Sequence, residues 1–365
     1  MKTVFISLVL LISFNLYAFP EMIRHGYTNC TACHVSPSGG GSLNQYGRSL
    51  SKEVLSTWGT DKEENFLHGA IDTESVNDWL VTGGDIRAVQ VHQENDNIKR
   101  GKFIKMQAGI ELGINRPKWA IVGSFGHFDN PSNDQEWKPD FTRYYALYRV
   151  IDGLTLRGGR FLPSFGINNS EHILSTRGPL GFGYGVEKDT VEASWLGENW
   201  NFVGSYYKTQ KQLTDTNESG FTALVSKIFG NNKVGVQYLN EKNNNYKRQI
   251  YGATGLLGWS EHFYTTVEYD KSLIEMGSTS TKMTGHYFLH CSGYEFYKGF
   301  HGLILNDYMQ TDENDGTTKN YKFGPGFQWF PRPHFDIQFY WTRQQSLQNA
   351  KSDGDYAWMV FHYYL

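Results

Sequence analysis

A five-residue motif near the N-terminus has the residue types and spacing for covalent cofactor chemistry. It reads Cys30-Thr31-Ala32-Cys33-His34, and this C-x-x-C-H pattern is the attachment signature of c-type haem. In such a site Cys30 and Cys33 form thioethers with the two vinyl groups of the porphyrin. The adjacent His34 then supplies the proximal imidazole to the iron. The motif therefore predicts one covalently bound haem c.

The C-x-x-C spacing also occurs in zinc sites and in redox disulfides. A zinc site needs a second pair of ligands, and the third cysteine, Cys291, lies far along the chain. A redox dithiol usually sits at a strand-to-helix junction of a βαβ unit, and no such pattern follows the motif. Haem attachment is our interpretation, with a disulfide or a metal knuckle as the alternatives.

The second axial ligand of this haem is the open chemical question. His25, shortly before the motif, is the first candidate distal ligand, and His68 is the alternative. Met22 and an open or water-filled position also remain. A second imidazole would give a lower reduction potential than a thioether, because Met ligation raises the potential.

The first residues predict export. Met1-Lys2 is a short basic start, an apolar run follows, and Leu16-Tyr17-Ala18 fits a cleavage site, so residues 1–18 are interpreted as a secretory signal peptide. The formal net charge of the chain is -3. Loss of Lys2 with the signal peptide leaves about -4. A charge so close to neutral argues against nucleic acid as a partner.

The composition favours a membrane barrel. Aromatic residues make up 16% of the chain, there are 39 glycines, and the mean hydropathy is -0.50. Outside the signal peptide no apolar stretch approaches the ~18–20 residues that a transmembrane helix requires. This combination is typical of an outer-membrane β-barrel, although a soluble β-sandwich or propeller can share it.

The strand pattern decides between these folds. From Trp79 to Leu365 we count sixteen alternating segments, each separated by a turn signal. Connections after even-numbered segments are tight turns, whereas those after odd-numbered segments are longer and richer in Asn, Asp, Ser and Gly. A barrel with short periplasmic turns and long outer loops produces this alternation. The predicted fold is all-β, a sixteen-stranded antiparallel transmembrane barrel over residues 79–365.

Side-chain faces follow from the period of two. In the segment 282–292 the apolar face is predicted to contact lipid and the polar face to line the lumen; the apolar residues are Met283, Tyr287, Leu289 and Cys291. Tryptophans near strand ends are predicted to anchor the barrel at the membrane interfaces; they are Trp137, Trp195, Trp200, Trp259, Trp329 and Trp358.

Residues 19–78 are predicted to form a small, partly helical segment that carries the haem and acts as a plug. Helices are expected over Leu43–Leu55 and Lys62–Ala70. The longest loop, 163–185, is the third outer loop, where general porins fold a constriction inward. Glu171, His172 and Arg177 are candidates for a pore eyelet, and an ordinary solvated loop is the alternative. Lumen-facing Arg143 and Arg149 are expected to form ion pairs with the wall.

The haem motif after a signal peptide, followed by a barrel, resembles the fused outer-membrane cytochrome–porins. The likeness includes Leu43-Asn44-Gln45-Tyr46-Gly47-Arg48, which is similar to a short L-N-x-x-G-R run after the haem in that family. This chain departs from the family in its shorter barrel and in the Pro/Gly/Ser turn after the haem. The resemblance implies electron transfer, and the best-known members take electrons from extracellular ferrous iron.

We therefore expect an electron-transfer protein of the bacterial outer membrane. It would pass single electrons between an extracellular donor or acceptor and a periplasmic c-type cytochrome, with outer-membrane lipid around the barrel. The first alternative is a diffusion porin whose haem-bearing segment is a plug or sensor. The second is a peroxidase-like enzyme, which would need an open iron position and a distal acid or base. No hydrolase, zinc-protease or phosphate-loop signature is present.

Overall fold

The computed structural model describes residues 21–65, 69–70, 79–128, 139–171, 173–183, 185–209, 217–277, 281–346 and 353–364. The predicted signal peptide, residues 1–18, lies outside these residues, as do His68, Trp137 and His172. No helix in the described part is long and apolar enough to cross a membrane.

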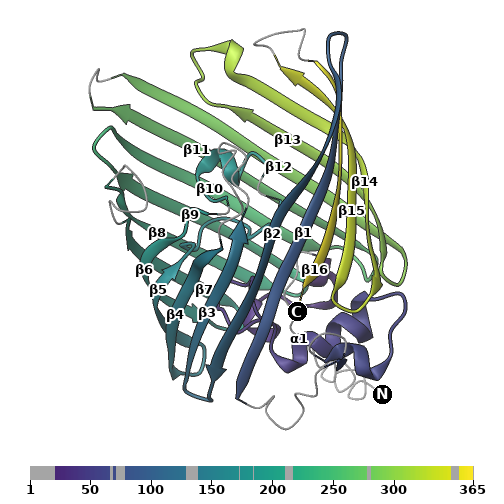
Figure 1. Cartoon of the computed structure of the whole chain (residues 1–365). Helices are drawn as coiled ribbons and strands as arrows, with labels where there is room; N and C mark the ends of the chain where they lie inside the picture. The colour runs from purple at the N-terminus through teal and green to yellow at the C-terminus, as the bar shows by residue number, and fades with distance from the viewer. Residues whose placement is uncertain are drawn as a thin grey trace, which may run out of the picture.

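Within the described residues, sixteen strands form one closed antiparallel barrel (Figure 1). Each strand pairs with its neighbours in the chain, and the first pairs with the last, with Val89 opposite Val360. The predicted barrel and its strand number are confirmed. The strands are β1 (Leu80–Glu94), β2 (Lys99–Asn115), β3 (Trp119–Phe128), β4 (Asp140–Ile151), β5 (Leu154–Phe161), β6 (Lys188–Leu196), β7 (Trp200–Lys208), β8 (Ser219–Phe229), β9 (Asn232–Lys242), β10 (Tyr246–Gly258), β11 (Phe263–Met276), β12 (Lys282–Tyr297), β13 (Phe300–Gln310), β14 (Lys319–Arg332), β15 (Phe335–Ser346) and β16 (Gly354–Tyr364).

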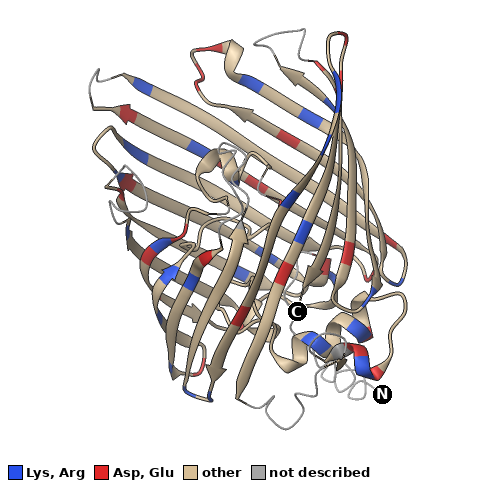
Figure 2. Ribbon diagram, in the orientation of Figure 1, with Lys and Arg blue, Asp and Glu red and all other residues tan. Residues whose placement is uncertain are grey.

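Alternating burial along the strands separates an outer from an inner face. On β3, Ala120 and Val122 are fully buried inside the barrel, whereas Ile121 between them is 55% exposed on the outside. The closed ladder leaves no sheet edge, so the backbone groups of every strand find partners without water. Lipid can then contact an apolar wall. Figure 2 shows long stretches of strand without charge and clusters of charge at the upper strand ends and on the N-terminal helices.

The connections identify the two ends of the barrel. The turns after even-numbered strands are tight, as between Asn115 and Trp119, and the glycine of the β4–β5 turn, Gly153, has a φ of 79°. Short turns mark the periplasmic end of an outer-membrane barrel. The described N-terminal residues and the C-terminus lie at this same end (Figure 1).

Residues 21–65, called the N-terminal segment below, contain short helical turns. These are η1 (Glu21–His25), η2 (Cys30–Ala32), α1 (Gln45–Leu50), the π-helical turn η3 (Ser51–Leu55) and η4 (Asp61–Glu64). The helix predicted over Leu43–Leu55 thus begins two residues later. Of the helix predicted over Lys62–Ala70, residues 62–64 are helical, within the 3-10 turn η4, which ends at the extended Asn65; residues 66–68 lie outside the described residues. Two further 3-10 turns, η6 (Gly178–Leu180) and η7 (Gly316–Thr318), lie in outer loops.

Part of the bore is filled by apolar side chains. We call them the bore cluster: Ile23, Val89, Leu174, Tyr264, Leu289, Leu303, Leu305, Tyr340, Trp358 and Val360. Ile23 comes from the N-terminal segment and Leu174 from the loop 163–185, so two chain segments meet the wall here. The bore of this barrel is therefore not lined by polar groups alone.

The bore cluster shows that two predictions about which side chains face the lipid were wrong. On β12 the apolar face, including Leu289 and Cys291, points into the bore, and the face with His286 and His290 points outward. Trp358 is 1% exposed inside the barrel and is not an interfacial anchor. The rule that apolar residues face lipid failed because the bore itself is apolar at this place. Trp195, Trp200 and Trp259 are exposed near the periplasmic turns, as predicted.

Candidate functional site

The haem motif forms a tight turn at the periplasmic mouth. Residues Cys30–Ala32 form the 3-10 turn η2, and the backbone N–H groups of Cys33 and His34 both donate to the carbonyl of Cys30, at 3.1 and 2.9 Å. All three thiols of the chain are free. The turn is compact enough to present Cys30 and His34 to one common space.

The L-N-x-x-G-R run, Leu43–Arg48, holds this turn in place through hydrogen bonds and close packing. Asn44 caps α1 by accepting a hydrogen bond from the N–H of Gly47 at 2.8 Å, and its amide donates to the carbonyl of Ala32 at 2.9 Å. The N–H of Asn44 donates to the carbonyl of Cys33 at 2.8 Å. A Cβ on Gly47 would lie 2.5 Å from that same carbonyl oxygen. Only glycine lets α1 pack this closely, so the run has a structural role in holding the motif.

Three glycines carry the chain past Cys30. Gly39, Gly40 and Gly41 have φ angles of 75°, 69° and 67°, a conformation that costs glycine little. A Cβ on Gly39 would lie 3.1 Å from the Cys30 sulfur. On Gly41 it would lie 2.7 Å from a carboxylate oxygen of Glu111 on β2. This glycine turn therefore fits between the motif and the barrel wall because it has no side chains.

His34 is held by the backbone and shielded from water. Gly41 provides a backbone hydrogen bond to the imidazole, and the short bridge between His34 and Leu43 fixes the chain on either side. Burial lowers the pKa of His34 to about 4, although Gly41 and Glu111 oppose this effect. The neutral ring is the form that ligates a metal, and a hydrogen bond on its other nitrogen is the usual way to orient such a ligand.

A cavity of about 400 Å³ opens beside Cys30 and His34. This volume lies in the range of cofactor pockets, roughly 300–1,000 Å³. Apolar residues of the wall and of the loop 163–185 line much of it, among them Phe161, Phe165, Phe182, Leu256, Leu303 and Tyr340. Arginines also border it, namely Arg87, Arg143, Arg157 and Arg177. Such a lining suits a large apolar group that carries acidic substituents.

The residues present fit the haem that the motif predicts. Cys30 and His34 border the cavity, and the glycine turn leaves room next to the Cys30 sulfur. Cys33 is 1% exposed and packs in a cluster at the mouth with Met22, Tyr27 and other apolar residues. A second thioether requires the Cys33 side chain to turn from this cluster toward the cavity.

Two of the candidate distal ligands, His25 and Met22, are not among the residues that line this cavity. His25 ends η1, and its imidazole interacts electrostatically with Arg24, Glu295 and Glu261. Burial lowers the pKa of His25 to about 4. Met22 is fully buried in the cluster that holds Cys33. The structure therefore brings Cys30 and His34 together and leaves the second axial position unassigned.

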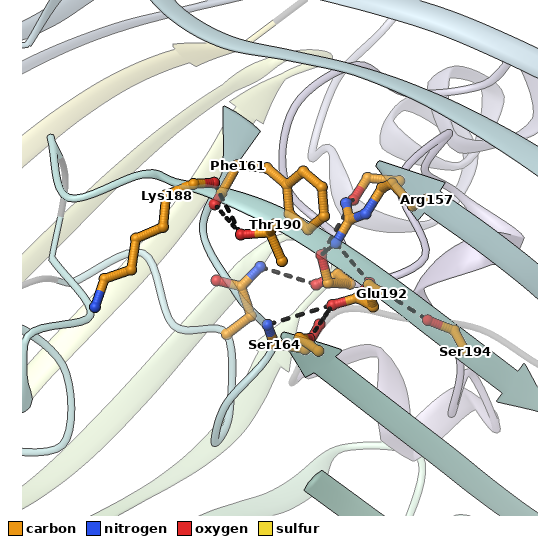
Figure 3. A network of polar contacts seen from close by, with 11 residues as sticks. Arg157, Phe161, Ser164, Lys188, Thr190, Glu192 and Ser194 are labelled. Carbon is orange, nitrogen blue, oxygen red and sulfur yellow. Dashed lines mark hydrogen bonds and ion pairs between the residues drawn. The ribbon is translucent and has the colours of Figure 1, made fainter. Parts of the chain in front are cut away.

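A buried ion pair joins the motif's glycine turn to the barrel. Arg157 on β5 donates to Glu192 on β6 at 2.7 Å, with side chains 2% and 0% exposed (Figure 3). The same guanidinium donates to the hydroxyls of Ser36 and Ser38, at 2.7 and 2.9 Å.

The partner carboxylate, Glu192, also fixes the outer loop. It accepts a hydrogen bond from the hydroxyl of Ser164 at 2.6 Å (Figure 3) and another from Ser205 on β7 at 2.8 Å. Arg157 further stacks over Phe161 at 3.7 Å. One pair of side chains thus ties the N-terminal segment, the loop 163–185 and the wall together.

The loop 163–185 folds into the bore, as a constriction loop does. The N–H of Ile167 donates to Glu268 on β11 at 3.1 Å, and the N–H of Ser175 donates to Asp307 on β13 at 2.9 Å. The predicted eyelet residues Glu171 and Arg177 are 5% and 3% exposed, so they are packed and not solvated. The predicted wall pairing of Arg143 is observed, at 3.5 Å from Glu111.

Sequence reasoning missed Arg157, Glu192 and Gly41. Arg157 and Glu192 belong to separate strands and pair only because β5 and β6 are neighbours with these two residues in register. Their sequence signal is weak: each is a charged residue at an inward position of a strand. The run Ser36–Ser42 is the Pro/Gly/Ser turn noted in the sequence, and its hydrogen bonds to Glu111 and Arg157 form only because the barrel wall surrounds it.

Comparisons with known proteins agree with this architecture. No protein-family model and no curated protein sequence matches the chain. Solved structures match over most of its length. OmpT of Vibrio cholerae is 9% identical with a TM-score of 0.60, and the match covers 78% of this chain and 97% of that one. OprB of Pseudomonas putida is 7% identical with a TM-score of 0.59, covering 86% and 99%.

A third structure, the anion-selective porin of Comamonas acidovorans, is 8% identical with a TM-score of 0.58, covering 78% of this chain and 99% of that one. At these identities the likeness concerns the fold. The matched parts are porin-type barrels, whose membrane is the bacterial outer membrane. The chain described here is therefore an outer-membrane β-barrel with a porin-like fold.

Proposed function

We propose that the protein is an outer-membrane cytochrome–porin that carries single electrons between an extracellular donor or acceptor and a periplasmic c-type cytochrome. The observation that supports this proposal is the position of the C-x-x-C-H turn. It sits in the mouth of the barrel, and Cys30 and His34 border a largely apolar cavity within the bore. A plain plug has no need for this juxtaposition.

In this proposal Cys30 and Cys33 hold the haem, and His34 is its proximal ligand. The backbone of Gly41 orients the imidazole, and Asn44 and Gly47 keep the turn in place. When bound, a haem c supplies reversible one-electron chemistry at its iron. The barrel wall and the apolar residues of the loop 163–185 would separate this haem from the lipid.

The periplasmic partner would approach the mouth of the barrel. Thr31 within the motif is exposed, and Tyr46 on α1 is 46% exposed at the same end. Tyr46 shares a hydrogen bond of 3.0 Å with Tyr27, which borders the cavity. A soluble cytochrome that docks here would come close to the motif without entering the barrel.

A diffusion porin with the N-terminal segment as its plug is the second candidate. The porin-type fold of the structural neighbours favours it. The apolar bore cluster and the infolded loop argue against a wide aqueous path. Conductance in a planar bilayer separates the two: a conduit carries little ionic current, and a porin gives an ohmic open channel.

The decisive measurement is the reduced-minus-oxidised absorption spectrum of the purified protein. We expect a c-type spectrum that survives denaturation, since the haem is covalently held, and its loss in the Cys30→Ala/Cys33→Ala variant. The matched control is Cys291→Ala, which removes a thiol outside the motif and should keep the spectrum. Wild-type protein without haem, matured in a host that attaches haem c, would refute the proposal.

A further inference from the structure

Three aromatic side chains run through the bore from the cavity toward the outer end of the barrel. Tyr340 on β15 borders the cavity, and its cross-strand partner is Trp358 on β16. Their ring centroids are 5.0 Å apart. Tyr356, two residues along the same face of β16, lies 5.5 Å from Trp358 by the same measure. The three rings form a continuous row.

The row is dry at its centre and reaches toward the outside. Trp358 is 1% and Tyr340 4% exposed, both within the bore cluster, and Tyr356 packs partly buried against it. β16 begins at Gly354, at the extracellular end, and Tyr356 is the third residue of the strand. Trp358 therefore lies about 13 Å along the strand from that end, at about 3.3 Å per residue.

The chemistry of the row differs from that of its neighbours. Leu, Val and Ile side chains cannot be oxidised at biological potentials, whereas indole and phenol rings lose an electron far more readily. Electron transfer also weakens steeply with distance, so an oxidisable ring between two redox centres shortens each transfer. The haem motif lies at the periplasmic mouth, so an oxidisable ring between it and the extracellular side would shorten the transfer of an electron across the membrane.

We propose that Trp358, flanked by Tyr340 and Tyr356, is a redox relay between the haem cavity and the extracellular side. This inference rests on the proposed electron-transfer function and adds a residue and a direction to it. Trp358 passes one electron toward the cavity, where a bound ferric haem would be the one-electron acceptor. One electron from an extracellular one-electron donor, such as a reduced metal complex, then refills the indole. The donor is oxidised by one electron and the relay is unchanged.

The proton inventory of this step is simple. The indole N–H of Trp358 is buried, and the carboxyl group of Glu171, on the loop 163–185, lies beside it as a hydrogen-bond acceptor. The oxidised indole can therefore share its N–H proton with the Glu171 carboxyl group, and the proton returns to the ring when the electron is replaced. No net bond forms or breaks in the protein over one cycle, because both the electron and the shared proton are restored to Trp358.

The test compares Trp358→Phe with Trp358→Tyr. Both variants leave a similar space in the bore cluster, but only tyrosine can be oxidised. In proteoliposomes with the outer end exposed, reduction of the haem by a membrane-impermeant donor should slow at least about tenfold in Trp358→Phe, a barrier increase of about 1.4 kcal/mol. Trp358→Tyr should recover much of the rate. Haem content and midpoint potential should match wild type in both.

A matched control is Trp341→Phe, because Trp341 is the neighbouring tryptophan on β15 and is 50% exposed on the lipid side. It should leave the rate unchanged. Equal rates in Trp358→Phe and wild type, with haem present in both, would overturn the relay while leaving the proposed function intact.

A second readout needs no haem. A ruthenium photo-oxidant is attached at Asp96→Cys, in the exposed β1–β2 hairpin, in a Cys30→Ala/Cys33→Ala/Cys291→Ser background. A flash excites the ruthenium(II) complex, and a dissolved oxidative quencher such as hexaammineruthenium(III) takes one electron from it. The resulting ruthenium(III) centre then takes one electron from the protein and returns to ruthenium(II). Transient absorption and electron paramagnetic resonance should show a tryptophan radical that disappears with Trp358→Phe and becomes a tyrosyl radical with Trp358→Tyr. A tryptophan radical of unchanged yield in Trp358→Phe would refute the assignment.

Discussion

Replacing Glu192 by glutamine should loosen the glycine turn that lies over the haem motif. The change keeps the size of the side chain and removes its charge, so Arg157 becomes a buried cation without an ionic partner. Breaking a buried ion pair in this way costs about 3–5 kcal/mol. Local opening of residues 36–42 lets water reach the guanidinium and recovers this energy. The opened state should therefore gain population.

The size of the effect follows from the same figure. A cost of 3–5 kcal/mol corresponds to a change of roughly 10²- to 10⁴-fold in a local opening equilibrium, since each 1.4 kcal/mol is a factor of ten. Hydrogen–deuterium exchange of the peptide that contains residues 36–42 reports this equilibrium directly. Its protection should fall by that factor in Glu192→Gln, whereas α1 should change much less.

The control is Glu241→Gln, which removes another fully buried wall carboxylate. Glu241 pairs with Lys188 and Arg248 near the outer end of the barrel, and it accepts hydrogen bonds from the wall residues Tyr207 and Tyr246. Exchange in residues 36–42 should match wild type in this control. Equal protection of the peptide in Glu192→Gln and Glu241→Gln would refute the reasoning that the ion pair holds the turn. Heat-modifiable migration on gels confirms that both barrels are folded.

Two further predictions concern the N-terminal segment. Gly47→Ala places a Cβ 2.5 Å from the carbonyl oxygen of Cys33, an overpacking that costs about 1–3 kcal/mol, so the haem-to-protein ratio should fall. The control Gly123→Ala, with nothing within 4 Å of the added Cβ, should keep the wild-type haem-to-protein ratio. Equal ratios in Gly47→Ala and Gly123→Ala would exclude the role of α1 in holding the haem motif. Burial raises the pKa of Glu21 from 4.5 to about 7. The N-terminal segment therefore takes up a proton when it docks in the barrel. Protonated Glu21 stabilises the docked state by up to about 3 kcal/mol; this contribution is complete below pH 4.5 and is lost as the pH rises through about 7. Hydrogen–deuterium exchange of residues 21–28, corrected for intrinsic rates, should show protection falling with rising pH in wild type and not in Glu21→Gln. Identical pH profiles of protection in the two proteins would contradict this prediction.

The barrel could be predicted from sequence because its signals are local. A strand exposes alternate residues to lipid, and a tight turn needs particular residues, so both leave marks within a few positions. The strand number followed from these marks. The orientation of β12 could not be predicted in this way. A period of two shows that Leu289 and Cys291 share a face of the strand, but it does not show whether that face points to the lipid or into the bore. The apolar filling of the bore decided it.

By itself, the sequence determined the haem motif, the run from Leu43 to Arg48 and the alternation of short and long connections. Each depends on residues close together in the chain, where spacing alone fixes the geometry. Only the tertiary structure decided that Arg157 and Glu192 hold the glycine turn, that Trp358 lies inside the bore, and that His25 lies away from the cavity. These facts depend on which strands become neighbours when the sheet closes. Closure of the barrel brings residues that are distant in sequence into contact, and a local sequence pattern does not predict such contacts.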